Sequence, residues 1–278
     1  MKTDTLITFI TERYRILARR KFSAKKPWTK DPILMDYKFT NVHRENDRVT
    51  IWIANNWRAP NKDDPDLWFA MVVARLLNRP ESLERLGYAV PWKRDRFVHM
   101  IHDAKSVGIP SFSGAYMIST HGMKADKAEF LADRVLTPLW ENRKYIRPRK
   151  GDTLAELHAR LTEHFGMGSF LGAQVVADMK YVKPLMEAVD YWTWASSGPG
   201  SRRGLNRIVG RPTSKSWREE DWLNVLQQLQ NKVEVPLLKR GIPRLHAQDL
   251  QNCLCEFDKY ERVRLNEGRM KQRYNGRS

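Results

Sequence analysis

The sequence predicts an all-α protein with two helical lobes, and three observations support this prediction. Apolar residues recur at helical spacing through most of the chain. Strand-like patterns are scarce, and the best of them, 49–53 (VTIWI), also suits a helix. Two stretches rich in basic residues, glycine and proline, around 144–151 and 196–216, interrupt the helices. We therefore expect a single helical domain over residues 1–278, with its two lobes divided near 144–151.

Each expected helix has its own pattern. The opening stretch, 1–17, is amphipathic, and the stretch 93–107 alternates basic and apolar faces, which is typical of a surface helix. The stretch 66–78 (DLWFAMVVARLLN) is apolar nearly all round and indicates a buried central helix. Capping boxes are expected at Thr153 with Glu156 and at Ser216 with Glu219. The remaining helices are expected over 124–140, 153–164 and about 248–265.

The chain is strongly basic. It carries 49 Lys and Arg against 32 Asp and Glu, a formal net charge of +17. Such a chain repels itself, and a polyanionic partner relieves the repulsion, so nucleic acid is the expected partner. Hydrophobic residues make up 41% of the sequence, which indicates a globular chain. No run of about 18 apolar residues and no signal-peptide pattern occurs, so no membrane partner is expected.

Metal and thiol chemistry find little support in the sequence. Cys253 and Cys255 lie in an apolar stretch and cannot supply four zinc ligands, so we expect buried thiols in a reducing compartment. His99 and His102 share a helix face without an evident third ligand. We expect no metal held by the protein and no certain cofactor, although Mg²⁺ could arrive bound to a pyrophosphate group.

The segment 161–181 (LTEHFGMGSFLGAQVVADMKY) predicts two helices joined by a tight turn at Gly166 and Gly168. In such a hairpin, backbone amides of the turn and of the next helix, which starts near Ser169, can bind a DNA phosphate. The stretch before it supplies further expected contacts to the DNA backbone, at Lys144, Arg147, Arg149 and Lys150. A simple helical hairpin is the alternative interpretation.

This hairpin resembles that of the helix-hairpin-helix DNA glycosylase superfamily. The resemblance implies a DNA-glycosylase-like helical fold and a catalytic aspartate about twenty residues after the second glycine, where this chain has Asp190. A helix N-cap is the alternative role for Asp190. Members of the superfamily with a lyase step carry a lysine two residues after that glycine, where Phe170 stands here. A lysine-dependent lyase step is therefore not expected.

Longer stretches resemble a narrower family, the α-glutamyl/putrescinyl thymine pyrophosphorylases, which are the amino acid:DNA transferases of phage thymine hypermodification. The resemblance covers roughly residues 30–265 and extends to the helical domain attached to phage 5-hydroxymethyluracil DNA kinases. The stretches that carry it are Tyr37–Val49 (YKFTNVHRENDRV), Phe165–Tyr181 (FGMGSFLGAQVVADMKY), Ser196–Ile208 (SSGPGSRRGLNRI) and Leu250–Val263 (LQNCLCEFDKYERV).

The resemblance implies chemistry on a base of double-stranded phage DNA, in the cytoplasm of the infected bacterium. There, a kinase converts 5-hydroxymethyluracil to its pyrophosphorylated form, and a transferase replaces the pyrophosphate with an amine such as glycine, glutamate or putrescine. The sequence has no Gly-x-x-x-x-Gly-Lys-Ser/Thr loop, so the transferase is expected rather than the kinase. No feature of the sequence selects one of these three amines.

The glycine-rich stretch Ser196–Arg207 is the expected binding site for the departing pyrophosphate. Gly198, Gly200 and Gly204 would let the backbone come close to the phosphates. Ser201, Arg202 and Arg203 would then bind the phosphate oxygens and stabilise the charge that develops on them. The alternative is that the two arginines bind the DNA backbone.

An amine attacks only after it loses a proton, so a carboxylate is expected nearby. Asn41, Arg44 and Asp47 recur at intervals of three and would form a polar stripe on a helix, while Glu256 and Lys259 have the same spacing. The candidate bases are Asp47, Asp178, Asp190, Glu256 and Asp258. For each of them, a structural ion pair or cap is the alternative.

The target base has to leave the DNA stack, and aromatic side chains offer it a new stacking partner. Trp192 and Trp194, which precede the glycine-rich stretch, are the expected partners. Two other functions stay open. One is a helix-hairpin-helix DNA glycosylase that uses Asp190, and the other is a DNA-binding module without catalysis.

Overall fold

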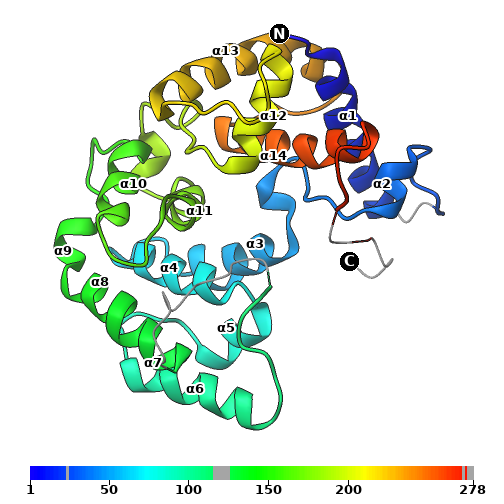
Figure 1. The fold of residues 1–278 in the computed structure, drawn as a ribbon. Helices are drawn as coiled ribbons and strands as arrows, with labels where there is room; N and C mark the ends of the chain where they lie inside the picture. The colour runs from blue at the N-terminus through cyan, green and yellow to red at the C-terminus, as the bar shows by residue number, and fades with distance from the viewer. Residues whose placement is uncertain (23–24, 115–125, 271–272, 274–278) are drawn as a thin grey trace. The chain divides into compact units, whose positions relative to one another are not determined.

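The computed structural model describes residues 1–22, 25–114, 126–270 and 273. All regular elements of these residues are helices, and Tyr37 and Arg273 form an isolated antiparallel bridge (Figure 1). The all-α prediction is therefore confirmed. The chain divides into two compact units, of which unit 1 comprises Met1–Asp47 and Trp192–Ser278, and unit 2 comprises Arg48–Tyr191.

Unit 1 joins the two ends of the chain around one hydrophobic core. Phe9 of α1, Trp222 of α13 and Leu254 of α14 are each at most 3% exposed and belong to this core. The amphipathic helix expected at the N-terminus thus supplies part of the core. The elements, coloured blue and yellow to red in Figure 1, are α1 (Asp4–Lys21), α2 (Pro32–Asp36), the 3₁₀ helix η1 (Arg44–Asn46), α12 (Pro199–Val209), α13 (Glu219–Leu238) and α14 (Ala247–Arg264).

Unit 2 is built around α4 (Leu67–Leu77), in which every residue is buried. This confirms the prediction of a central buried helix, which packs against α11 (Ser169–Met179). The other elements are α3 (Arg48–Ile53), the π-helix η2 (Ala54–Arg58), α5 (Pro80–Leu86), α6 (Arg94–Ser106), α7 (Lys127–Leu131), the π-helix η3 (Ala132–Leu136), α8 (Thr137–Glu141), α9 (Arg143–Ile146), α10 (Leu154–Thr162) and the 3₁₀ helix η4 (Leu185–Glu187).

Helix starts follow the sequence in part. Thr153 and Glu156 form the expected capping box of α10, and the ambiguous stretch 49–53 is helical, within α3. The capping box expected at Ser216 is wrong, because α13 begins after Arg218 without a side-chain cap. The carboxylate of Glu219 binds Ser197 instead. Residues 124 and 125 of the helix expected over 124–140 lie outside the described residues.

The segment 144–151, where we expected the lobes to divide, lies inside unit 2; residues 144–146 belong to α9, and 147–151 lead from it towards α10. Arg147 ties it to the start of α4 through two hydrogen bonds to Asp66, of 2.7 and 2.6 Å. Arg160 of α10 donates to the carbonyl oxygens of Ile146 and Arg147 in this segment and pairs with Asp152, the residue that follows it. The divisions between the two units fall at residues 47/48 and 191/192 instead.

Candidate active site

The glycine-rich stretch is helical from residue 199 onward, so the expectation of a loop there is wrong for 199–209. Pro199 occupies the first turn, where its fixed φ suits a helix and its missing N–H is not needed. The N–H of Gly198 donates to Oγ of Ser201 over 2.9 Å, and this serine is fully buried. Ser201 therefore stabilises the start of α12.

Two glycines of α12 allow it to pack closely against α14. A Cβ atom on Gly204 would overlap the carbonyl oxygen of Leu254, and one on Gly200 would overlap Sγ of Cys255. A Cβ on Gly198 would meet only Nε2 of Gln251, at an ordinary 3.8 Å. The close backbone approach that the glycines permit is thus between two helices, where the sequence had suggested an approach to phosphate.

This packing joins Arg203 and Arg207 of α12 to Asp258 of α14. Asp258 is fully buried, and its two carboxylate oxygens accept from Nε of Arg203 over 2.8 Å and from Nε of Arg207 over 3.0 Å. Arg262 approaches the same carboxylate within 3.5 Å. A buried carboxylate that binds arginines is a poor base, because accepting a proton would break these ion pairs. Asp258 instead fixes the direction of Arg203.

Arg203 is bound to Asp258 on one side and open to solvent on the other. Its side chain is 39% exposed, and its terminal nitrogens bind no described residue. Lys259 is similarly accessible, at 36%, and its ammonium lies 2.6 Å from Oε1 of the buried Glu256. Burial raises the pKa of the Cys255 thiol and Glu256 adds to this, whereas the charges of Lys259 and Arg203 lower it. Lys259 and Asp258, the partner of Arg203, follow Cys255 by four and three residues on α14 and share its helix face.

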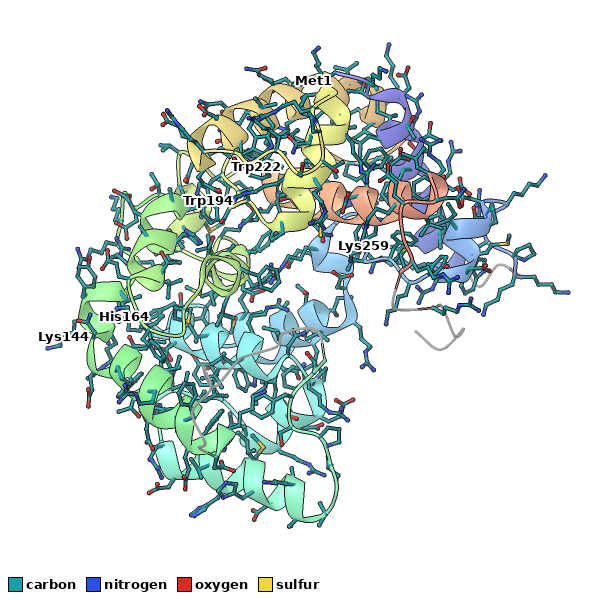
Figure 2. All side chains as sticks on the ribbon, in the orientation of Figure 1. Met1, Lys144, His164, Trp194, Trp222 and Lys259 are labelled. Atoms are coloured by element: carbon teal, nitrogen blue, oxygen red, sulfur yellow. The ribbon has the colours of Figure 1, made fainter. Side chains whose placement is uncertain are left out.

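We call the group formed by Gly200, Arg203, Cys255, Glu256 and Lys259 the α12–α14 site. It presents two cations over buried carboxylates, and Figure 2 labels Lys259 on α14. A guanidinium held at Nε by a carboxylate can still offer its outer N–H groups to a phosphate. The site can therefore bind an anion.

Arg202, the neighbour of Arg203, has a different environment. Its Nε donates to Oγ of Ser197 over 2.6 Å, and its terminal nitrogen binds Glu219 at 3.0 Å. Burial raises the pKa of Glu219, but hydrogen bonds from Ser197 and Arg202 outweigh it, and the pKa lies below its usual value. Arg202 thus fixes the start of α12 against α13, and the two neighbouring arginines do not share one partner.

The stretch 41–47 forms a turn rather than the helical stripe that its spacing suggested, because only 44–46 is helical, as η1. Oδ1 of Asp47 accepts from the N–H and the side-chain amide of Asn41, over 3.1 and 2.8 Å. The N–H of Arg44 donates to Asp249 of α14. The N–H of Thr40 lies 3.4 Å from Oε2 of Glu256, so this turn lies beside the α12–α14 site.

The two tryptophans chosen as stacking partners are both engaged within the protein. Trp194 is buried, at 7% exposure. Trp192 stacks on the imidazole of His246, with ring centroids 4.1 Å apart, and the guanidinium of Arg244 lies 4.6 Å from its ring. A base that stacked on the face of Trp192 covered by His246 would have to displace that imidazole.

Asp178 and Asp190 belong to unit 2, and each binds groups of that unit. Asp178 is fully buried and forms a bidentate pair with Arg75, with two N–O distances of 2.6 Å. The carboxylate of Asp190 accepts from the N–H groups of Leu154 and Ala155, over 2.8 and 3.0 Å, at the start of α10. Asp190 therefore caps the start of a helix, as the alternative interpretation predicted. The helix is α10, which lies far before Asp190 in the sequence.

The expected DNA contacts also lie in unit 2. α10 and α11 form a helical hairpin whose turn contains Gly166, with φ +80°, and whose second helix starts after the exposed Gly168 and Ser169. A Cβ on Gly166 would overlap Val135. Lys144, labelled in Figure 2, is exposed, as are Arg149 and Lys150, whereas Arg147 is committed to Asp66.

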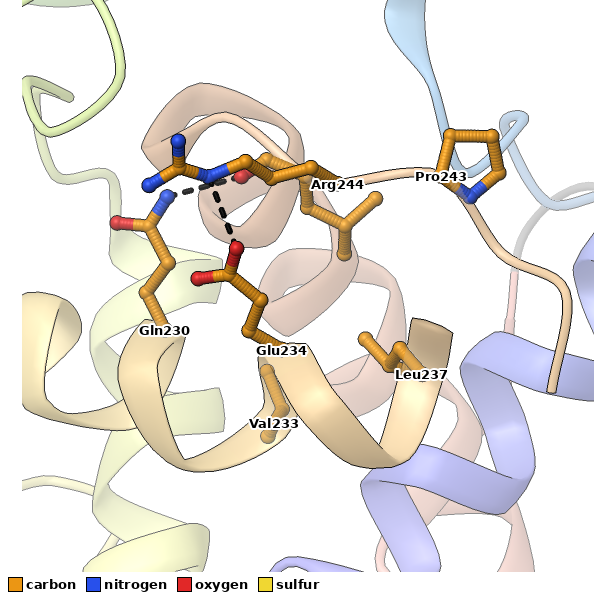
Figure 3. A pocket seen from close by; sticks show the side chains of 7 residues that line it. Gln230, Val233, Glu234, Leu237, Pro243 and Arg244 are labelled. Carbon is orange, nitrogen blue, oxygen red and sulfur yellow. Dashed lines mark hydrogen bonds and ion pairs between the residues drawn. The ribbon is translucent and has the colours of Figure 1, made fainter. Parts of the chain in front are cut away.

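A cavity of unit 1 lies between α13 and the segment before α14, as Figure 3 shows. It holds about 10 Å³, room for one water molecule at most. Arg244 at its edge pairs with Glu234 at 3.1 Å, and Gln230 donates to the carbonyl of Leu245. This cavity is too small for a nucleotide or an amino acid.

Among the described residues, no three His, Cys, Asp or Glu side chains are grouped so as to hold a metal ion. No helix in the described part of the chain is both long and apolar enough to span a bilayer.

The sequence did not single out Glu219 or Arg207 as site residues. Arg207 lies at the end of the glycine-rich stretch, four residues after Arg203. On a helix this spacing places the two arginines on one face, and it could have predicted their shared partner. Glu219 carried no such signal, because its contact with Ser197 arises from packing of α13 against the start of α12.

The fold and the site define a strongly basic, all-helical protein with a cationic surface supported by buried carboxylates. The model of one family, the helical domain of 5-hmdU DNA kinase, matches residues 1–270, and the chain belongs to this family. A relative, the 5-hmdU DNA kinase of Bacillus phage SP10, is 27% identical over 231 residues, which are 74% of this chain and 36% of the relative. The chain thus matches much less than the whole relative. No solved structure matches it.

Proposed function

We propose that this chain is a DNA-modifying transferase. It would replace the pyrophosphate of 5-(pyrophosphoryloxymethyl)uracil in double-stranded phage DNA with glycine, glutamate or putrescine, in the cytoplasm of the infected host. The observation that carries the proposal is the α12–α14 site, where two accessible cations, Arg203 and Lys259, are held by buried carboxylates of α14. The family supports it, because a substrate derived from 5-hmdU in DNA suits a relative of 5-hmdU DNA kinases.

In the proposed reaction, the bond between the 5-methylene carbon and the pyrophosphate oxygen breaks, and its electron pair leaves with pyrophosphate. The amine nitrogen forms a bond to the same carbon and loses one proton. Negative charge therefore grows on the departing oxygen, where Arg203 and Lys259 would stabilise it. Mg²⁺ that enters with pyrophosphate would add to this stabilisation.

The assignments for the other residues follow from their partners. Asp258 is a positioning residue, since it binds Nε of Arg203. Glu256, which is buried and bonded to Lys259, positions that ammonium in the same way, and the amine proton passes to water. Asp178 and Asp190 take no proton in this scheme, because Arg75 and the start of α10 occupy their oxygens. Gly168, Ser169, Lys144, Arg149 and Lys150 are the proposed contacts to the DNA backbone.

The test uses the full chain with duplex DNA that carries 5-(pyrophosphoryloxymethyl)uracil and one of the three amines. The DNA is digested to nucleosides and analysed by mass spectrometry, with pyrophosphate release followed in parallel. We expect an amino-substituted nucleoside with at least one amine. Arg203→Ala should lower kcat by about 10²–10³ while the affinity for DNA falls less than tenfold, because the interaction strengthens in the transition state.

Lys232→Ala, at an exposed position of α13, is the matched control and should leave both quantities unchanged. Equal losses of kcat and DNA affinity in Arg203→Ala would assign this arginine to the DNA backbone. Folded protein that yields no substituted nucleoside with any of the amines would disprove the transferase. Release of free base would point to a glycosylase, and binding alone to a non-catalytic module.

A further inference from the structure

The N-terminal part of unit 1 carries a dense group of cations that the α12–α14 site does not use. Between Glu12 and Asp31 the sequence has no acidic residue. In the same interval it has eight basic residues, namely Arg13, Arg15, Arg19, Arg20, Lys21, Lys25, Lys26 and Lys30. Arg13 is buried, but Arg15, Lys21, Lys25, Lys26 and Lys30 are exposed. We call these five exposed residues the N-terminal basic surface.

The fold places the basic residues at the end of α1 close to those of the stretch 25–30. The guanidinium of Arg20, on α1, lies 5.5 Å from the ring of Trp28, and the ammonium of Lys26 lies 5.0 Å from the same ring. Arg19 donates to the carbonyl oxygen of Trp28. The end of α1 and the stretch 25–30 are therefore held against each other, although both are cationic. Like charges brought this close repel each other unless an anion lies over them.

The nearest carboxylates in the sequence have partners of their own. Glu12 pairs with Arg19 at 3.0 Å. Asp31 caps α2 through the N–H groups of Ile33 and Leu34, and its other oxygen accepts from the hydroxyl of Tyr260 over 2.7 Å. Lys21 contacts a neutral group, Oδ1 of Asn46, at 3.1 Å. Glu12 thus neutralises Arg19, which is not one of the five exposed residues, and the oxygens of Asp31 are bound by α2 and Tyr260.

The hydrogen bond between Asp31 and Tyr260 also connects this surface to the α12–α14 site. Lys30 precedes Asp31 in the chain, and Lys259 precedes Tyr260 on α14. This hydrogen bond therefore holds the end of the basic stretch against α14, the helix that carries Lys259, and both belong to unit 1. A phosphate backbone that follows these positions would meet positive charge from Lys25 and Lys30 to Lys259.

We propose that the N-terminal basic surface binds the phosphate backbone of double-stranded DNA and leads it to the α12–α14 site. This inference rests on the proposed function in one respect, since DNA is taken as the partner. Its warrant is charge complementarity: five exposed cations lie in a stretch without an acidic residue, contacts with Trp28 hold residues 25–30 against α1, and DNA phosphates carry the opposite charge. Such contacts carry affinity and position, and no base sequence.

The test compares two triple variants of the full chain with the same change in charge. The surface variant is Lys21→Gln/Lys25→Gln/Lys30→Gln, and the control variant is Lys215→Gln/Lys232→Gln/Lys239→Gln, at exposed positions elsewhere in unit 1. The affinity for an unmodified 20-base-pair duplex is measured from about 50 to 300 mM salt, after unfolding curves show that both variants are folded. Each lost phosphate contact should make the slope of log K against log salt shallower by about 0.9.

We expect the surface variant to lose about two to three units of slope and 10–100-fold in affinity near physiological salt, and the control less than threefold. Equal losses in the two variants would overturn the inference, because net charge would then account for the binding. It would also be overturned if binding to anionic lipid vesicles depended on these lysines more than DNA binding does. The proposed function and this inference can fail separately. If the surface variant loses DNA affinity as expected but the wild type transfers no amine, the proposed function is refuted and this inference stands.

Discussion

The residues of this chain that the sequence offered as bases include two that serve to hold arginines. Asp258 and Asp178 are both fully buried; Asp178 binds Arg75 through both carboxylate oxygens, and the two oxygens of Asp258 bind Arg203 and Arg207. Spacing along a helix shows which side chains share a face, but it does not show which residue of a distant helix lies opposite. The change from base to positioning residue for Asp258 therefore depends on Arg203, which lies 55 positions away.

At this scale, Asp47 gives a prediction on pH. Burial raises its pKa above the ordinary 3.8, although Asn41, Arg44 and Arg13 oppose the rise. The folded state therefore holds this proton more tightly than the unfolded state does. The contribution of Asp47 to the free energy of unfolding is therefore greatest below the pKa that this carboxyl has in the unfolded state. It is lost as pH rises through the pKa of the folded state. Asp47→Asn cannot ionise and lacks this dependence.

We therefore expect the free energy of unfolding of the wild type to fall relative to that of Asp47→Asn as pH rises from about 4 to 7. Urea unfolding at several pH values measures the difference. Exposed Glu220→Gln serves as the control and should run parallel to the wild type. A constant difference between wild type and Asp47→Asn over this range would contradict the prediction.

At the scale of elements, α12 shows how a helix can arise from a sequence that favours a loop. Three glycines and a proline within 198–204 lower helix propensity. Tertiary packing compensates, because the missing side chains of Gly200 and Gly204 allow α14 to approach and bring Asp258 to the arginines of α12. The same helix contact thus buries apolar surface and builds the site.

Gly204→Ala tests this account. The added methyl would overlap the carbonyl oxygen of Leu254, which belongs to backbone and cannot swing aside. We expect a loss of about 2 kcal/mol or more in the free energy of unfolding, from overpacking between α12 and α14. Gly198→Ala, on the same element with only an ordinary contact, should cost less than about 1 kcal/mol. Similar costs for both, in urea unfolding, would contradict it.

At the scale of the whole molecule, the two units differ in how they are made from the chain. Unit 2 is one continuous segment, whereas unit 1 needs both ends, since α1 contributes Phe9 and Ile10 to the core that α13 and α14 complete. Continuous segments with their own core can fold alone. Unit 2 meets this condition through the fully buried α4 and the helices around it.

We therefore expect a fragment of residues 48–191 to fold by itself, with a helical circular dichroism spectrum and a cooperative urea transition. The fragment 192–278, which lacks α1, should show no such transition, because the partners of Phe9 and Ile10 become exposed. Cooperative unfolding of 192–278 alone would show that α1 is dispensable for unit 1.

The sequence by itself determined the fold class, the central helix α4, the cap of α10 and the basic character of the chain. These follow from composition and from periodicity within short stretches, which physical chemistry relates directly to helices and to polyanion binding. It also marked the segments that supply Arg203, Glu256, Asp258 and Lys259. Only the tertiary structure decided that α12 is a helix and that the chain divides at 47/48 and 191/192. Roles such as the pairing of Arg203 with Asp258 depend on contacts between residues far apart in sequence, which no local pattern encodes.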